Sequence, residues 1–275
     1  MPATLVIRDG DPHWWASPDI WVVPGIDPNG SPGQPVAGEP AYLWGRARNT
    51  GDQTVTGARV DFYWSNPATG VLRSNSTLVG SAFVDLNAGE VKDVLCVIPW
   101  TPVIVNEGHE CVVAEIVHSA DPLPAPPPDA FDPPTYRQIA QKNLSVLAMR
   151  RLSLVRTIQL AAPRREARSL RVSIEVGGSL DKEVLARAGL EGFRPAKGSI
   201  EAGLSTEAGC EPSGKAELAK DLEVVLKPGT TRAVYLKVPP ARLESKTYVP
   251  IHVVSRNGDR IDGGITFVVV NREEE

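Results

Sequence analysis

The sequence predicts an all-β protein made of two tandem immunoglobulin-like β-sandwiches, the second with a short helical insertion. Short runs of alternating apolar and polar residues recur along the chain, which is typical of half-buried strands. Turn residues separate these runs, since 25 prolines and 24 glycines are spread over 275 residues. All six tryptophans lie in the first hundred residues, and the length suits two domains. We therefore expect one sandwich over residues 1–148 and a second over residues 149–275.

In the first half, apolar runs bounded by turn residues predict seven strands. They cover residues 19–23, 41–53, 58–70, 76–86, 90–100, 109–118 and 143–147. Alternation places Val60, Phe62 and Trp64 on the core face of their strand and turns Trp44 and Tyr63 outward. The matching small or core-facing residues of the preceding strand are Ala41, Leu43, Gly45 and Ala47. Large side chains of one sheet would then pack over small ones of the other.

A proline-rich stretch interrupts this series of strands. Residues 121–134 contain seven prolines, so they cannot form a helix or an inner strand. We expect a stiff loop before the last strand of the first sandwich. Its single PxxP sequence, Pro124 to Pro127, is explained by chance in such a loop. Residues 135–143 are expected to form a helical turn that leads back to that strand.

The second half repeats the strand pattern and adds one helix. The strands are expected over residues 151–162, 167–178, 198–204, 216–226, 232–239, 247–255 and 263–270. The segment 179–189 predicts the helix, with Ser179 as N-cap, acidic residues in the first turn and Gly189 after the last turn. The pair Asn257-Gly258 predicts a tight hairpin between the last two strands.

The charge distribution separates the two halves. Residues 1–148 carry 16 acidic and 8 basic side chains, and residues 149–275 carry 17 acidic and 21 basic ones. The halves therefore have net charges of −8 and +4, and the dispersed positive charge is too weak to indicate nucleic-acid binding. No apolar run reaches the 18 residues of a membrane span. The N-terminus lacks a basic segment followed by an apolar one, so the cytoplasm, a removed leader and another export route all stay open.

No recognisable catalytic or metal-binding motif is present. The four histidines lie in different segments, and neither H-E-x-x-H nor C-x-x-C occurs. There is no G-x-S-x-G elbow and no glycine-rich phosphate loop before a helix. His109 with Cys111 and Cys96 is the one conceivable soft-metal group, and it would need a further ligand from elsewhere. We expect no enzyme activity, no metal and no cofactor.

The three cysteines are too few and too scattered for a disulfide framework. Cys96 and Cys111 lie in apolar strand-like runs, where small buried thiols are the simplest expectation. A Cys96–Cys111 bridge stays open and would require an oxidising compartment. Cys210 lies in the second half.

Several phrases of the first half stand out together. They are Trp14-Trp15-x-Ser17-Pro18-Asp19-Ile20-Trp21-Val22, Arg46-Ala47-Arg48-Asn49-Thr50-Gly51, Phe62-Tyr63-Trp64, Trp100-Thr101-Pro102, Gly108-His109-Glu110-Cys111 and Ile139-Ala140-Gln141-Lys142-Asn143-Leu144. In combination, over about residues 10–148, they resemble the bacterial CARDB-like Ig-fold domains, which are accessory modules beside proteases and other catalytic or surface domains. The second half resembles generic bacterial Ig-like domains. The resemblance implies adhesion or protein–protein interaction and brings no active-site residues.

The aromatic side chains are the candidate binding residues. Trp14 and Trp15 crowd the N-terminal segment, while Trp44 and Tyr63 are predicted to face outward. Aromatic anchors are favoured at interfaces and also stack on sugars, although most tryptophans are buried in cores. We expect a non-catalytic scaffold, adaptor or accessory subunit. It would bind a protein partner, such as a protease or an assembly component, through loops and edge strands. The alternative is a module that binds carbohydrate or a cell surface.

Overall fold

A computed structural model of the chain describes residues 2–66, 69–103, 111–148, 153–208 and 218–271. Strands dominate the structure and helix is scarce, so the predicted all-β class is confirmed. The chain divides into two compact units. The first comprises Met1–Asn66, Val71–Asn143 and Asp181–Leu190, and the second comprises Pro67–Gly70, Leu144–Leu180 and Glu191–Glu275.

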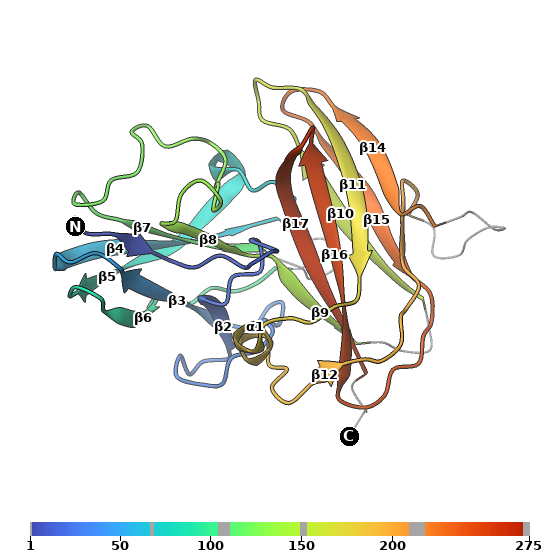
Figure 1. Cartoon of the computed structure of the whole chain (residues 1–275), viewed down its shortest axis with the longest axis horizontal. Coiled ribbons are helices and arrows are strands. Elements are labelled where there is room, and N and C mark those ends of the chain that lie inside the picture. Colours follow the sequence, from blue (N-terminus) through green and yellow to red (C-terminus); the bar gives the residue numbers. More distant parts are fainter. Residues whose placement is uncertain (1, 67–68, 104–110, 149–152, 209–217, 272–275) are drawn as a thin grey trace. The chain divides into compact units, whose positions relative to one another are not determined.

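Two four-stranded sheets build the first unit (Figure 1). Its elements are β1 (Leu5–Val6), β2 (Ile20–Pro24), β3 (Ala41–Asn49), β4 (Val55–Ser65), the 3-10 turn η1 (Arg73–Asn75), β5 (Ser76–Leu86), β6 (Val91–Leu95), β7 (Cys111–Val117) and β8 (Ile139–Lys142). In one sheet β3 pairs with β1 and β2 along one edge and with β6 along the other. The second sheet has the order β5-β4-β7-β8, with every pair antiparallel.

The core of the first unit follows the predicted alternation. Val60 and Phe62 are fully buried, and Trp64 packs against the same cluster. The core-facing residues Ala41, Leu43 and Ala47 of β3 belong to this cluster too. A Cβ atom at Gly45 would lie 3.2 Å from the Phe62 ring, so the small residue makes room for the large one.

The proline-rich loop is held firmly against the outer face of β7 and β8. Phe131 is buried there with Val113 and Ile139, and its backbone N–H donates to the Val71 carbonyl over 3.0 Å. The Arg73 guanidinium lies 4.2 Å from the centre of the Phe131 ring and forms an ion pair with the buried Glu115. The loop is thus a covering layer as well as a connection.

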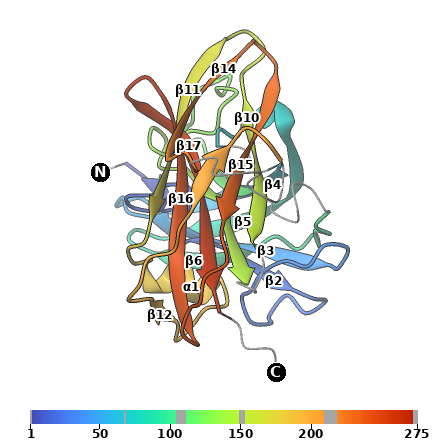
Figure 2. The same cartoon turned by 90° about the vertical axis from the view of Figure 1, so that its right-hand side faces the viewer.

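The second unit also contains two sheets (Figure 2). Its strands are β9 (Leu144–Ala148), β10 (Leu154–Ala161), β11 (Arg168–Val176), β12 (Arg194–Pro195), β13 (Gly203–Ser205), β14 (Asp221–Leu226), β15 (Thr231–Val238), β16 (Thr247–Asn257) and β17 (Arg260–Val270). The larger sheet has the order β14-β11-β16-β17-β9, with β12 added in parallel to β16. The smaller sheet has the order β10-β15-β13. Apolar side chains from both sheets form one buried cluster.

Two predictions around residue 143 were wrong. Residues 139–142 form β8, which pairs with β7, where a helical turn was expected. The strand expected at 143–147 runs over Leu144–Ala148 and pairs in parallel with β17, so it belongs to the second unit. Only Asn143 separates β8 from β9, and its backbone N–H donates to the Trp15 carbonyl. Because β8 and β9 are short and adjacent in sequence, their apolar patterns merge into a single predicted strand, and the residues before it were assigned to a turn.

The predicted helix exists but is shorter and capped differently. It is α1 (Lys182–Arg187), and the Asp181 side chain accepts from the Glu183 N–H over 2.6 Å, so Asp181 rather than Ser179 is the N-cap. Gly189 follows with φ of 73°, a left-handed conformation that suits glycine after a helix. Residues Asp181–Leu190 pack in the first unit, whereas the helix was expected as an insertion of the second sandwich.

The Asn257-Gly258 hairpin is confirmed between β16 and β17, with Gly258 at φ of 62°. Gly258→Ala is expected to lower the free energy of unfolding by about 1–2 kcal/mol, because a side chain disfavours this conformation. Gly198→Ala is the matched control, since a Cβ atom at either glycine meets nothing within 4 Å and Gly198 has no positive φ. Chemical denaturation followed by far-ultraviolet circular dichroism measures both. Equal losses for the two variants would contradict the expectation.

Candidate functional site

The four predicted binding aromatics lie in three separate places. Trp14 and Trp15 are buried, with exposed fractions of 8% and 1%. Their rings lie edge-to-face, with ring centres 5.7 Å apart. Trp44, on β3, and Tyr63, on β4, are half-buried and belong to different sheets. Side chains on the outer faces of opposite sheets cannot share one ligand, so the four residues form no common platform.

Each half-buried aromatic has neighbours of its own. Trp44 stacks on Trp21 with ring centres 5.7 Å apart and planes within 8°, and its Nε1 donates to the Pro28 carbonyl over 2.9 Å. The Arg187 guanidinium of α1 lies over the Trp21 ring, 3.6 Å from its centre. Tyr63 packs on Phe131 of the proline-rich loop. These contacts give the aromatics a role in stabilising the first unit.

An ion network centred on the buried Asp19 carboxylate extends to α1 through an exposed pair. The Asp19 carboxylate has no exposed surface and accepts from Arg8 Nη2 over 2.7 Å and from Arg48 Nη2 over 3.2 Å. Burial alone would raise the pKa of Asp19, but the hydrogen bonds from these two arginines lower it below its usual value. Arg8 Nη2 also lies 2.6 Å from a carboxylate oxygen of Glu183 on α1.

Lys142 is a buried amine beneath the end of α1. Its Nζ donates to the Ile20 carbonyl over 3.2 Å and to the Arg187 carbonyl over 3.3 Å. Burial, together with the nearby Arg187 charge, lowers the pKa of Lys142 to about 7. Both contacts are to backbone carbonyls of the protein itself, so Lys142 links β8, β2 and α1.

The two thiols among the described residues lie in settings that disfavour the reactive thiolate. Cys96 and Cys111 are buried and not bridged, and burial raises the pKa of each. Among the described residues no three His, Cys, Asp or Glu side chains are grouped as metal ligands would be. His109 and Cys210 lie outside the described residues. In the same described ranges, no helix is long and apolar enough to cross a bilayer.

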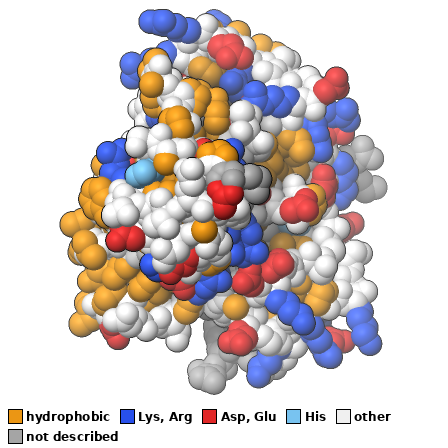
Figure 3. Space-filling view, turned by 60° about the vertical axis from the view of Figure 1, so that its left-hand side comes forward, with side chains coloured by type: hydrophobic (Ala, Val, Ile, Leu, Met, Phe, Trp, Pro, Cys, Tyr) orange, Lys and Arg blue, Asp and Glu red, His pale blue; other side chains and the backbone are white. Residues whose placement is uncertain are grey.

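The largest exposed apolar side chains of the first unit include a group on β5, on β6 and just after β6. Phe83 is 71% exposed and Val97 65%. Leu78, Val91 and Ile98 are exposed as well. In the space-filling view, hydrophobic side chains gather in one area at the lower left (Figure 3). Single exposed apolar residues are ordinary, whereas a contiguous apolar area is typical of interaction surfaces.

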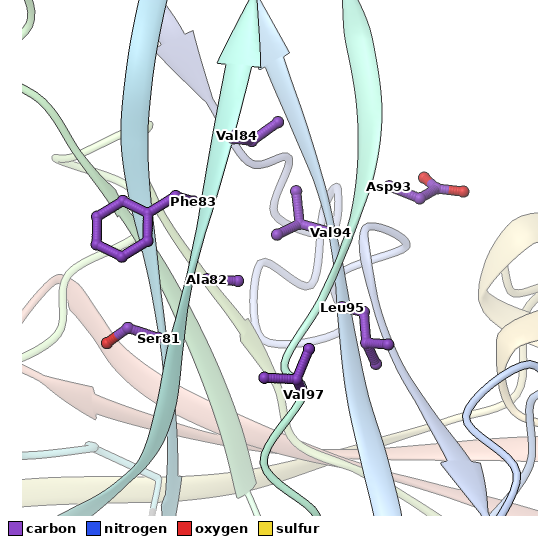
Figure 4. Close-up of a pocket in the computed structure, with 8 residues that line it drawn as sticks. All are labelled: Ser81, Ala82, Phe83, Val84, Asp93, Val94, Leu95 and Val97. Carbon is purple, nitrogen blue, oxygen red and sulfur yellow. The ribbon is translucent and has the colours of Figure 1, made fainter.

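Between β5 and β6 lies an open groove of about 410 Å³, here called the edge groove. It is lined by Ser81, Ala82, Phe83, Val84, Asp93, Val94, Leu95 and Val97. Ala82 and Val84 point toward Val94, whereas Phe83 and Ser81 project from the other face of β5 (Figure 4). A chain lying beside β5 would therefore meet apolar side chains on both of its faces.

Both strands that line the groove are edge strands. Across the described residues, β5 pairs only with β4, and β6 only with β3. The eleven residues of β5, STLVGSAFVDL, include no lysine, arginine or proline, the residues that usually protect an edge from added strands. Lys92 of β6 covers one end of this edge, since its Nζ donates to the Asp85 carbonyl over 2.8 Å. The apolar positions of β5 contained the signal in the sequence, because Leu78 and Phe83 lie on the outward face, where a solvated strand would carry polar residues.

Comparison with known proteins does not identify a family. No protein-family model and no curated protein matches the chain. Solved structures with weak similarity include a Paenibacillus cycloisomaltooligosaccharide glucanotransferase in complex with cycloisomaltoheptaose, at 19% identity over 41% of this chain, with a TM-score of 0.23. Red sea bream transglutaminase has 12% identity over 93% of this chain and a TM-score of 0.24. CBD12 from CALX1.2 has 10% identity over 84% and a TM-score of 0.22.

The matched regions cover 12%, 32% and 93% of those three proteins, respectively. At TM-scores this low, the similarities support no statement about family or activity. None of the three names a CARDB-like domain, and that resemblance stays a prediction.

Proposed function

We propose that this chain is a non-catalytic interaction protein whose first unit binds a protein partner at the edge groove. The single observation that carries the proposal is the edge strand β5, which contains no lysine, arginine or proline, with the exposed Phe83 beside an apolar groove. Edge strands with free backbone groups and apolar neighbours favour association with another chain. The partner would be a protease or another catalytic or assembly component, as the CARDB-like resemblance implies.

The strand order supports an immunoglobulin-like assignment for the first unit. With β1 and β2 as strand A, the sheets correspond to the A-B-E and C′-C-F-G sheets of that fold, without a strand D. In the second unit β14-β11-β16-β17 corresponds to the C′-C-F-G sheet, with β9 in parallel beside β17, while β10 and β15 correspond to strands B and E and β13 is added beside β15. In the first unit the missing strand D leaves β6 as an edge facing the groove. We therefore propose two immunoglobulin-like domains.

The carbohydrate-binding alternative has weaker support. Trp14 and Trp15 are buried and offer no stacking face, and Tyr63 is packed beneath the proline-rich loop. Trp44 remains, half-buried on an outer sheet face, and its ring already stacks on Trp21. A sugar site would rest on this one ring.

The test uses Phe83→Asp, which places a charge on the exposed face of β5. Proteins captured by the wild-type chain from its source cells are compared with those captured by the variant. We expect recovery of the partner to fall at least about tenfold, because hot-spot aromatics contribute 2 kcal/mol or more. Ile26→Asp is the matched control, since Ile26 is 84% exposed and lies in a loop. Equal recovery by wild type and Phe83→Asp would overturn the proposal.

A further inference from the structure

We infer that the edge groove binds an extended segment of a partner protein, which adds as a strand to β5 and carries apolar side chains at alternate positions with basic residues at its ends. This inference rests on the proposed function and names the chemistry of the partner. It follows from the pairing and the side-chain directions of the edge and from the charge of the first half.

The pairing of β5 sets the length of the added strand. Its longest stretch of regular register with β4 runs from Gly80 to Val84; the register shifts near Val79 and between Val84 and Leu86, and residues 76–78 pair beyond the first shift. Register shifts bend a strand and interrupt regular pairing. A chain that adds to this edge would therefore pair over about five residues, and Phe83 lies within that stretch.

The side-chain directions set the pattern of the partner. Ala82 and Val84 face the groove and Val94, so the partner's side chains on that face would enter apolar surroundings. Ala82 is small and leaves space for a medium-sized side chain such as valine or leucine. On the other face the partner would lie beside Phe83, where an apolar or β-branched cross-strand neighbour is favoured. Both faces therefore favour β-forming residues without proline.

The charge of the first half sets the charge of the partner. In the segment 76–97 the acids are Asp85, Glu90 and Asp93; Lys92 pairs with Glu90 and Arg46 with Asp93, so the excess of acids lies in the first half as a whole. The whole stretch 1–148 has a net charge of −8. A basic segment would be attracted to this surface, whereas a second copy of the chain would bring the same acidic surface against it. The charge therefore favours a basic partner over self-association through β5.

The experiment pans a phage-displayed library of random dodecapeptides on the full-length chain. We expect the enriched peptides to be positively charged and to alternate apolar and polar residues over about five positions, as strand addition requires. Their synthetic forms should bind less tightly by about tenfold when lysines and arginines are replaced by glutamate. Binding should also weaken between about 50 and 500 mM salt, because salt screens exposed charges.

Two chain variants locate the binding. Phe83→Asp should lower the affinity of the chain for the peptides at least about tenfold, whereas Ile26→Asp should leave this affinity unchanged. Since both side chains are exposed, neither substitution is expected to unfold the chain, and tryptophan fluorescence checks this. Enrichment of acidic, proline-rich or helical peptides, binding that Phe83→Asp leaves intact, or no enrichment at all would overturn the inference.

Analytical sedimentation of the full-length chain tests whether a second copy of the chain occupies the edge groove. A dimer that Phe83→Asp dissociates would assign the edge groove to a second copy and overturn the basic-peptide inference. If cellular capture still depends on Phe83 while the panning fails, only the chemistry of the partner is wrong. If capture is also independent of Phe83, the proposed function fails with it.

Discussion

Replacing Asp19 with alanine is expected to lower the free energy of unfolding of the first unit by about 3–5 kcal/mol, as is typical when one partner of a buried ion pair is removed. The carboxylate is fully buried, and Arg8 and Arg48 both donate to it. Without it, two guanidinium groups lose their main acceptor in a partly buried site. Arg8 also contacts Glu183, so the attachment of α1 would weaken too.

The measurement is chemical denaturation followed by tryptophan fluorescence. All six tryptophans belong to the first unit, so this signal reports that unit selectively. Asp93→Ala is the matched control, because Asp93 pairs with Arg46 at a site where its side chain is 39% exposed. Exposed pairs contribute at most about 1 kcal/mol. Similar losses for the two variants would mean that the burial of Asp19 is not what makes it important.

The second large effect is a rise in stability with pH that depends on Lys142. Its pKa is lowered from 10.5 to about 7 in the folded chain, so between these values the unfolded state binds more protons. The free energy of unfolding should therefore increase with pH from about 7 upward, by at most about 1.4 kcal/mol per pH unit. Below about pH 7 the Lys142 amine is charged in the folded chain, so the full cost of burying this charge lowers the free energy of unfolding.

The useful window for this measurement is between about pH 7 and 8.5. Above about pH 9 the raised pKa values of Cys96 and Cys111 act in the opposite direction, because the unfolded thiols lose protons first. Lys142→Met keeps the apolar stem and removes the titrating amine. The slope of stability against pH should be absent in this variant and present in the wild type. A slope that survives in Lys142→Met would assign it to another group.

The alternation of the sequence was sufficient to predict most strands. The expected strand at 76–86 coincides with β5, and the Asn257-Gly258 hairpin lies where its turn chemistry indicates. The core positions Val60 and Phe62 were also predicted correctly. These features depend on local periodicity and turn residues, which a single sequence contains.

Features that depend on distant contacts were not predicted. The sequence indicates a helix at 179–189 but not that its partners would be Arg8, Trp21 and Lys142 of the first unit. The outward direction of Trp44 and Tyr63 was expected from alternation, yet stacking and the proline-rich loop cover much of each ring. The edge groove was missed because the identity of an edge strand is a property of the sheet order.

The division of the chain into its two units has a consequence for genetic dissection. A cut at residue 148, where sequence composition changes, would remove Asp181–Leu190 from the first unit and leave β9 attached to the wrong fragment. The amine of Lys142 and the ring of Trp21 would then lose their covering from Arg187. Each unit is discontinuous in the sequence, so an exchange that keeps the first unit whole must carry Asp181–Leu190 with it.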